Sequence, residues 1–258
     1  MGQALIEGML KNGFPLSQIA VCEIDPQKVR FIQKKFKIQA IPDFVSRSLS
    51  SDMVVLCVKP QSIKTVMSEL GLLPSSPRLL ISIAAGVRIQ QIERHFKKNI
   101  PIIRVMPNTP AAIGLGMSAL AVNRAVKKIH CQMAEQIFSS VGQTVFVHEK
   151  WMDAVTAVSG SGPAYIYLVI HALIEGGMAL GLAPAVARQL ACQTVIGAAR
   201  MVQASLESPL DLMKKVMSPG GTTEAGIKVL DRFHFTKILE QAVQKAAERS
   251  KELSRFSD

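Results

Sequence analysis

The chain has 258 residues, of which 48% are hydrophobic and 19% are charged. At roughly 150 residues per domain, this length predicts one large domain or two modest ones, and the composition excludes a disordered chain. The formal net charge is +11, but the basic residues are spread along the chain, without an arginine-rich arm or zinc-finger spacing. The net charge alone therefore does not support nucleic-acid binding, and aromatic residues, at only 5%, leave little material for stacking on single strands.

The cysteine and histidine pattern argues against metal and nucleophilic chemistry. None of the four cysteines lies within metal-ligand spacing of another, and no Ser–His–Asp or Cys–His arrangement is evident. We therefore predict no metal site. The cysteine usage, with no secretory leader, favours a reduced, cytoplasmic setting.

The first half of the chain alternates strand and helix signals. Strands are expected at residues 19–22, 53–58, 79–83, 102–106, 118–122 and 144–147. Helices are expected at residues 3–10, 26–36, 62–70 and 125–141. Asp25 and Pro26 are a typical N-cap and first helical residue, and the unbroken apolar run 53–58 is typical of a central parallel strand covered on both faces. This alternation predicts a doubly wound α/β domain.

After Trp151 the character changes to helical periodicity without further strand signals. We therefore predict a doubly wound α/β domain over 1–149 and an all-α domain over 150–258. The apolar stretch 154–187 is long enough to span a bilayer, but it contains several glycines and prolines together with His171 and Glu175. Burial in a subunit interface is the favoured interpretation.

The cofactor side of the expected site begins at the N-terminus. In dinucleotide-binding folds a first strand runs into a glycine-rich turn, and the pyrophosphate lies at the start of the next helix. The chain begins where that helix is expected, so Met1-Gly2 is interpreted as the end of such a turn. Glu23 follows about 20 residues later, where an acid commonly binds the adenine ribose hydroxyls, although a solvated acid is the alternative. Glu23 and Asp25 would repel a 2′-phosphate, which favours NADH over NADPH.

Three further segments stand where strands are expected to end, which is where ligands bind in open α/β sheets. Small residues allow a flat ligand to approach the backbone, and an asparagine beside two prolines offers both a donor and an acceptor. Ordinary strand-to-helix turns are the alternative. The segments are Val58-Lys59-Pro60-Gln61, Ile83-Ala84-Ala85-Gly86 and Met106-Pro107-Asn108-Thr109-Pro110.

The substrate side is predicted at residues 218–223, Ser-Pro-Gly-Gly-Thr-Thr, directly before a helical run. Two glycines free the backbone, Ser or Thr can cap the next helix, and unpaired N–H groups at a helix start suit a small carboxylate. A plain capped turn is the alternative. A second glycine-rich segment, 159–163, opens the apolar stretch and is interpreted as a tight helix contact or a wall of the same pocket.

Taken together, five segments closely resemble pyrroline-5-carboxylate reductases: Val58–Pro60, Ser82–Val87, Val105–Pro110, Ser159–Tyr165 and Ser218–Thr223. The match covers nearly the whole chain. The resemblance implies reduction of 1-pyrroline-5-carboxylate to L-proline with NADPH or NADH, the last step of proline biosynthesis. It also implies a Rossmann domain followed by a helical dimerisation domain, hence a homodimer or a larger oligomer of dimers, with neither nucleic acid nor membrane as a partner.

With this resemblance, the expected site can be assigned residue by residue. The cofactor-binding residues are Met1, Gly2, Glu23, Val58, Lys59, Pro60, Ala84, Ala85 and Asn108. The substrate-binding residues are Ser218, Gly220, Gly221, Thr222 and Thr223. Thr223 is the expected catalytic residue, its hydroxyl directed to the ring nitrogen.

Two departures and two rival interpretations accompany this assignment. The family begins with a strand and a Gly-x-Gly-Asn-Met-Gly turn, of which only Met1-Gly2 is present, so we expect an N-terminally incomplete domain. The family usually favours NADPH, whereas Glu23 indicates NADH. A β-hydroxyacid dehydrogenase relative would carry a lysine on the first helix of the second domain, and residues 162–180 contain none. A dimeric binding protein that lost the cofactor turn is the non-enzyme alternative.

Overall fold

The computed structural model describes residues 1–42, 51–73 and 77–255. The chain forms two compact units, one made of Met1–Ser161 with Lys245–Asp258 and the other of Gly162–Gln244. We refer to them as the α/β unit and the helical unit. The domain ranges expected above, 1–149 and 150–258, stay a prediction.

The α/β unit alternates strands and helices as the sequence predicts. Its strands are β1 (Ala20–Cys22), β2 (Gln39–Ile41), β3 (Val54–Leu56), β4 (Leu80–Ser82), β5 (Ile102–Met106), β6 (Gly116–Val122) and β7 (Gly142–Phe146). Its helices are α1 (Gly2–Lys11), α2 (Pro26–Phe36), α4 (Pro60–Gly71), α5 (Ile89–Glu93), α6 (Lys128–Ser139) and α7 (Met152–Val155). The Rossmann-type class is confirmed, and no residue described after β7 is in a strand.

The strands form two sheets. β1 and β2 pair in parallel, and β3, β4, β5, β6 and β7 follow one another in the second sheet. Pairing in that sheet is parallel except between β5 and β6, which run antiparallel. Among the described residues β3 pairs only with β4, so the central position that its apolar run predicts is not observed.

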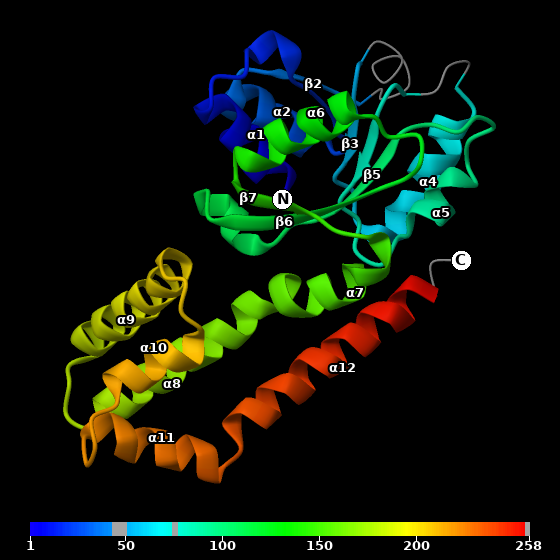
Figure 1. The fold of residues 1–258 in the computed structure, drawn as a ribbon. Coiled ribbons are helices and arrows are strands. Elements are labelled where there is room, and N and C mark those ends of the chain that lie inside the picture. The colour runs from blue at the N-terminus through cyan, green and yellow to red at the C-terminus, as the bar shows by residue number, and fades with distance from the viewer. Residues whose placement is uncertain (43–50, 74–76, 256–258) are drawn as a thin grey trace. The chain divides into compact units, whose positions relative to one another are not determined.

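The other part of that prediction, that both faces of the strand are covered, is confirmed and accounts for the apolar run of β3. Leu56 packs in a cluster with side chains of α4 and α5, whereas Val55 packs against a second cluster, which contains residues of α1 and α6. Figure 1 shows these two helix pairs on opposite sides of the five-stranded sheet. A third cluster joins α1 and α2 to the β1–β2 pair.

The expected cap of α2 is confirmed. The Asp25 carboxylate accepts hydrogen bonds from the backbone N–H groups of Gln27 and Lys28, and Pro26 is the first helical residue. An Asp N-cap satisfies backbone donors that have no partner within the helix. This fixes where the chain turns after β1, next to Glu23.

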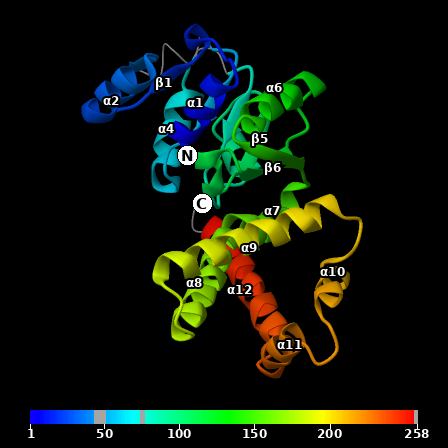
Figure 2. The same ribbon diagram turned by 90° about the vertical axis from the view of Figure 1, so that its left-hand side faces the viewer.

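The helical unit contains α8 (Gly162–Ala179), α9 (Pro184–Ala204), α10 (Pro209–Val216), α11 (Thr222–Arg232) and the first part of α12 (Phe235–Arg255). Helix α8 packs on α9, where Gly177 lies against Leu182 and Ala187. Figure 2 shows α10 on the stretch of chain that leads from α9 to α11. The last turns of α12 belong to the α/β unit.

Candidate active site

The carboxyl ends of three parallel strands meet at one edge of the five-stranded sheet. The register aligns Leu56 of β3 with Ser82 of β4, and Ser82 with Arg104 of β5. The segments that continue from these positions begin with Cys57, Ile83 and Val105. The structure therefore brings the predicted residues Val58, Lys59, Pro60, Ala84, Ala85 and Asn108 to the same edge.

The loop after β4 presents one alanine and buries the other. Ala84 is only 4% exposed, and its N–H donates to the Ser82 hydroxyl oxygen at 3.3 Å. Ala85 is exposed. Gly86 follows with a φ of +77°, a left-handed conformation that a side chain disfavours. Of the two alanines predicted at the cofactor, Ala85 is the one that a ligand can reach, whereas Ala84 supports the loop from within.

Asn108 fixes the loop after β5. Its side-chain oxygen accepts from the N–H of Met117 at 2.8 Å, and its amide nitrogen donates to the carbonyl of Ser159 at 3.1 Å. The sequence predicts a group that offers a donor and an acceptor. Both kinds of bond are present, but their partners are other parts of the α/β unit. The amide keeps a second N–H and a second oxygen lone pair that a ligand could use.

The N-terminal residues lie beside the end of β3. Helix α1 begins at Gly2, and Met1, its N-cap, provides no side-chain cap. A Cβ atom at Gly2 would lie 3.4 Å from the Cβ of Cys57, the residue directly after β3. The first N–H groups of a helix have no partner within it, so the start of α1 offers donors near the strand edge.

Glu23 stands directly after β1, where it was predicted. Its backbone N–H donates to the carbonyl of Ile41, and its carboxylate accepts from the N–H of Asp25 at 3.1 Å. Lys28 adds a cation that the sequence interpretation missed: its Nζ lies 3.8 Å from the carboxylates of both Glu23 and Asp25. The spacing Glu23-x₄-Lys28 across a capped helix start could have identified it.

The predicted substrate segment, 218–223, forms a turn in the helical unit. The N–H of Gly221 donates to the carbonyl of Ser218 at 2.9 Å, and Gly220 has a φ of +70°. Pro219 followed by a glycine with positive φ is typical of a type II turn. Helix α11 then begins at Thr222, so that Thr223 is its second residue and is half-buried.

The start of α11 differs from the expectation in its cap. Gly221 is the N-cap and no side chain caps the helix, so the expected Ser or Thr cap is wrong. Instead the Glu224 carboxylate accepts from the N–H of Gly220 at 2.6 Å and pairs with Lys228 at 2.9 Å. Both bonds hold the pKa of Glu224 below its usual value, and the bond from Lys228 has the larger effect. Two of the N–H groups predicted for an anion, those of Gly220 and Gly221, are thus bonded to the chain itself.

An irregular helix that the sequence did not predict ends within the second glycine-rich segment. Residues Thr156–Gly160 form a π-helical turn, a feature that occurs often at functional sites. A Cβ atom at Gly160 would lie 2.7 Å from the terminal methyl of Met106, so Gly160 allows close packing on the end of β5. Together with the Asn108–Ser159 bond, this contact attaches the segment to the strand edge.

The predicted residues divide between the two units. All predicted cofactor-binding residues lie in the α/β unit, and all predicted substrate-binding residues lie in the helical unit. Which of them touch a ligand stays a prediction. Among the described residues no group of three or more His, Cys, Asp or Glu side chains could hold a metal ion.

The run Glu149–Ala179 is long and apolar enough to cross a membrane by length and composition alone. A single run of this kind is weak evidence for a membrane span. Several large apolar side chains of α8, including Tyr167 and Leu168, are exposed in the single chain. Such a surface also suits a contact between subunits.

Two family models match this chain. One, described as pyrroline-5-carboxylate reductase dimerisation, matches residues 149–253. The other, described as NADP oxidoreductase, coenzyme F420-dependent, matches residues 1–86. The first match assigns homo-oligomerisation to the region in which α8 exposes its apolar side chains.

Full-length relatives agree with these models. The pyrroline-5-carboxylate reductase of Synechocystis is 41% identical over 256 residues, which are 99% of this chain and 95% of that protein. The solved pyrroline-5-carboxylate reductase of Coxiella burnetii has a TM-score of 0.92 at 38% identity, covering 98% of this chain and 94% of that one. The Plasmodium falciparum pyrroline carboxylate reductase, solved with NADP bound, has a TM-score of 0.88 at 31% identity, covering 98% and 94%. The chain therefore belongs to the pyrroline-5-carboxylate reductase family.

Proposed function

We propose that this protein reduces 1-pyrroline-5-carboxylate to L-proline by hydride transfer from NAD(P)H, the last step of proline biosynthesis. The observation that carries the proposal is the near full-length match to enzymes of that name. The aligned strand ends support it, because they place the predicted cofactor residues at one edge of the sheet.

The α/β unit fits a dinucleotide. The uncapped start of α1 beside Cys57 offers N–H donors to a pyrophosphate, and exposed Ala85 leaves room for a flat ring at the end of β4. When bound, NAD(P)H supplies the hydride. We assign Val58, Lys59 and Pro60, which follow β3, to cofactor binding. Asn108 keeps the loop after β5 in place.

The helical unit supplies the substrate residues. The substrate is a cyclic imine with a carboxylate, and the backbone of Ser218–Thr223 is assigned to that carboxylate. The Thr223 hydroxyl hydrogen-bonds the ring nitrogen, which must carry a proton as the neighbouring carbon accepts hydride. Because a protonated imine is already electrophilic, orientation by these residues supplies much of the effect.

The acceptance of both cofactors follows from the charges around Glu23. Its carboxylate suits the ribose hydroxyls, and with Asp25 it opposes a 2′-phosphate. Lys28, 3.8 Å from both, offsets part of that repulsion. We propose that NADH is accepted alongside NADPH, and that the enzyme works in the cytoplasm as a homodimer or an oligomer of dimers, without a nucleic-acid or membrane partner.

A steady-state assay tests the function. Purified protein is given 1-pyrroline-5-carboxylate with NADPH or NADH, and oxidation of the cofactor is followed by absorbance while proline is measured directly. Proline formed in proportion to the cofactor consumed is the expected result. Absence of proline with both cofactors, from protein that is folded and oligomeric, would overturn the proposal.

The variant Thr223→Ala tests the assigned catalytic residue. Loss of one hydrogen bond of about 0.5–2 kcal/mol should lower kcat/KM a few-fold to about thirtyfold. Thr223→Ser, which keeps the hydroxyl, is the matched control and should stay close to the parent enzyme. Unchanged kinetics in Thr223→Ala would remove Thr223 from the mechanism.

A further inference from the structure

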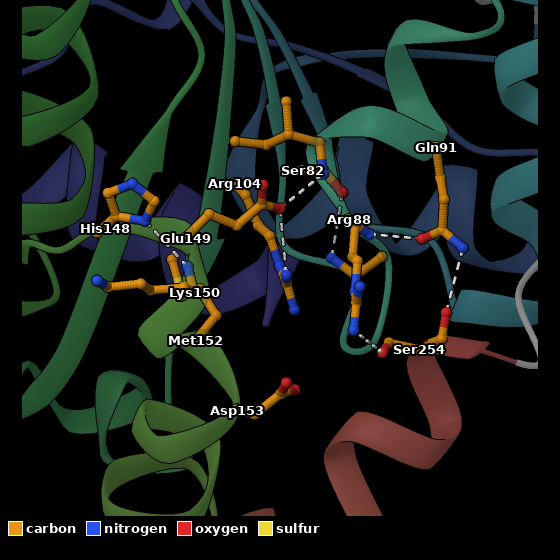
Figure 3. Close-up of polar contacts among 12 residues, drawn as sticks. Ser82, Arg88, Gln91, Arg104, His148, Glu149, Lys150, Met152, Asp153 and Ser254 are labelled. Carbon is orange, nitrogen blue, oxygen red and sulfur yellow. Dashed lines mark hydrogen bonds and ion pairs between the residues drawn. The ribbon is translucent and has the colours of Figure 1, made fainter.

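A buried arginine lies on β5, four residues before Asn108. Arg104 is 5% exposed, and its Nη1 lies 3.3 Å from the Oε1 atom of Glu149. Burial lowers the pKa of Arg104, and the carboxylate of Glu149 opposes this shift by favouring the charged form. Figure 3 shows the two side chains directed toward each other. Because an unpaired buried charge is unfavourable, the arginine depends on this partner.

Glu149 makes a second contact with the same oxygen. Its Oε1 accepts from the backbone N–H of Ile89 at 2.7 Å, and Ile89 is the first residue of α5. One carboxylate oxygen thus joins β5, the start of α5 and the segment at residue 149. The loop Ala84–Arg88, which carries the accessible Ala85, lies directly before that helix start.

The same loop is held from the opposite direction by the last turn of α12. Arg88 donates from Nη2 to the Ser254 hydroxyl at 3.0 Å, and Gln91 donates from Nε2 to the Ser254 carbonyl at 3.2 Å (Figure 3). A Cβ atom at Gly86 would lie 3.6 Å from the backbone of Leu253. The loop after β4 is therefore fixed on two sides, by Glu149 and by α12.

The segment at 149–159 is also bound to β5 at two points. Glu149 contacts Arg104 within the strand, and the Ser159 carbonyl accepts from Asn108, which follows the strand. Through these bonds, the loops after β4 and β5 are both attached to the segment 149–159. A shift of Glu149 would displace the start of α5 and with it the loop that contains Ala85.

We infer that Arg104 and Glu149 form a positioning pair that sets the loops after β4 and β5 for the cofactor. Neither residue is assigned a contact with the cofactor, and both act through Ala85 and Asn108. This inference rests on the proposed function, since that function places the cofactor at this edge. The alternative is that the ion pair serves only folding. A buried ion pair is weak evidence for such a role, because the cost of removing its charges from water offsets much of their attraction.

The test uses two variants that remove one charge each. Glu149→Gln keeps the shape of the side chain and an oxygen that can accept from Ile89, whereas Arg104→Met keeps an unbranched apolar side chain but lacks the guanidinium. The double variant R104M/E149Q removes both charges. If one variant fails to fold, the other still decides, because each alone breaks the same pair.

The readout is cofactor binding without substrate. Trp151 is the only tryptophan of the chain, and NADPH is titrated while its fluorescence and that of the reduced cofactor are both followed. We expect each single variant to raise the Kd for NADPH about tenfold, and the double variant to bind no more weakly than the weaker single one. The KM for 1-pyrroline-5-carboxylate at saturating cofactor should stay within about twofold, because the substrate residues are unchanged.

Asp52→Asn is the matched control. Asp52 pairs with Arg78 at 2.6 Å, but both side chains are exposed, and they precede β3 and β4 instead of following them. This variant should bind NADPH like the parent protein. If Glu149→Gln lowers the Tm but leaves the Kd for NADPH unchanged, the positioning role is wrong while the proposed function stands. If the parent protein neither binds NADPH nor forms proline, the proposed function itself fails.

Discussion

The two units of this chain differ in how they bury their apolar side chains. In the α/β unit, three clusters fill the space between the sheets and their helices, and large residues such as Phe138, Leu80 and Ile103 are fully buried. In the helical unit, the buried apolar residues of the described chain are Ala187 and Ala191. Its larger apolar residues, such as Leu168 and Leu190, are exposed in the single chain.

The helical unit therefore lacks an apolar partner surface as a single copy. Fully burying a large aliphatic side chain stabilises by about 1.5–3 kcal/mol, and α8 and α9 leave many such side chains in water. The family model for dimerisation covers these helices. A second copy of the chain therefore provides the apolar partner surface that the α/β unit finds within itself.

The largest expected effect comes from charging the exposed face of α8. Leu168 is 68% exposed in the single chain, so Leu168→Glu should fold locally but oppose assembly, because burying an unpaired carboxylate costs on the order of several kcal/mol. Light scattering after size-exclusion chromatography should show a shift toward the mass of one chain. Ile129→Glu, at an exposed position on α6 of the α/β unit, should leave the mass unchanged. An unaltered mass for Leu168→Glu would mean that α8 lies outside the interface.

An intermediate effect is expected inside the α/β unit. Phe138 of α6 is fully buried, and Phe138→Ala should lower the free energy of unfolding by about 3–5 kcal/mol through lost burial and the resulting cavity. The loss should not depend on protein concentration, because the core belongs to one chain. Denaturant unfolding at two concentrations checks this, and a strong concentration dependence would contradict the contrast between the units.

The smallest effect concerns a local signal. Asp25→Ala removes the acceptor for two N–H groups of α2 and should lower the free energy of unfolding by about 1 kcal/mol. Asp25→Asn, which keeps an acceptor oxygen, should retain most of that stability. Equal losses in both variants would show that charge, and not the cap, is what Asp25 contributes.

Local patterns predicted the fold well where the cause is local. Asp25-Pro26 marked the start of α2, and the apolar runs marked β4 and β5 within one residue at each end. The antiparallel direction of β6 was not predicted, because the pattern of apolar residues in a strand does not indicate whether it pairs in parallel or antiparallel. Among the described residues β3 is the outermost strand of its sheet, and the sequence missed this for a related reason: a run is apolar wherever both faces of the strand are covered, at any position in the sheet.

The candidate site was predicted as a set of segments but not as a set of contacts. The strand-end motifs identified the edge, since consecutive parallel strands end together. Glu149 binds partners 45 and 60 residues away, and Ser254 binds Arg88 across 166 positions. Such bonds depend on packing between distant segments, and no periodicity or spacing rule reports them.

The return of α12 to the α/β unit limits how fragments and chimeras of this protein can be designed. Because Ser250 and Ser254 bond to Asp153 and Arg88, the α/β unit is assembled from both ends of the polypeptide. A fragment that stops at residue 161 would leave those bonds unmade. A chimera that exchanges the helical unit between two reductases must therefore join the chain at two crossovers, one on each side of the insert, and take its final helical turns from the same parent as its first strands.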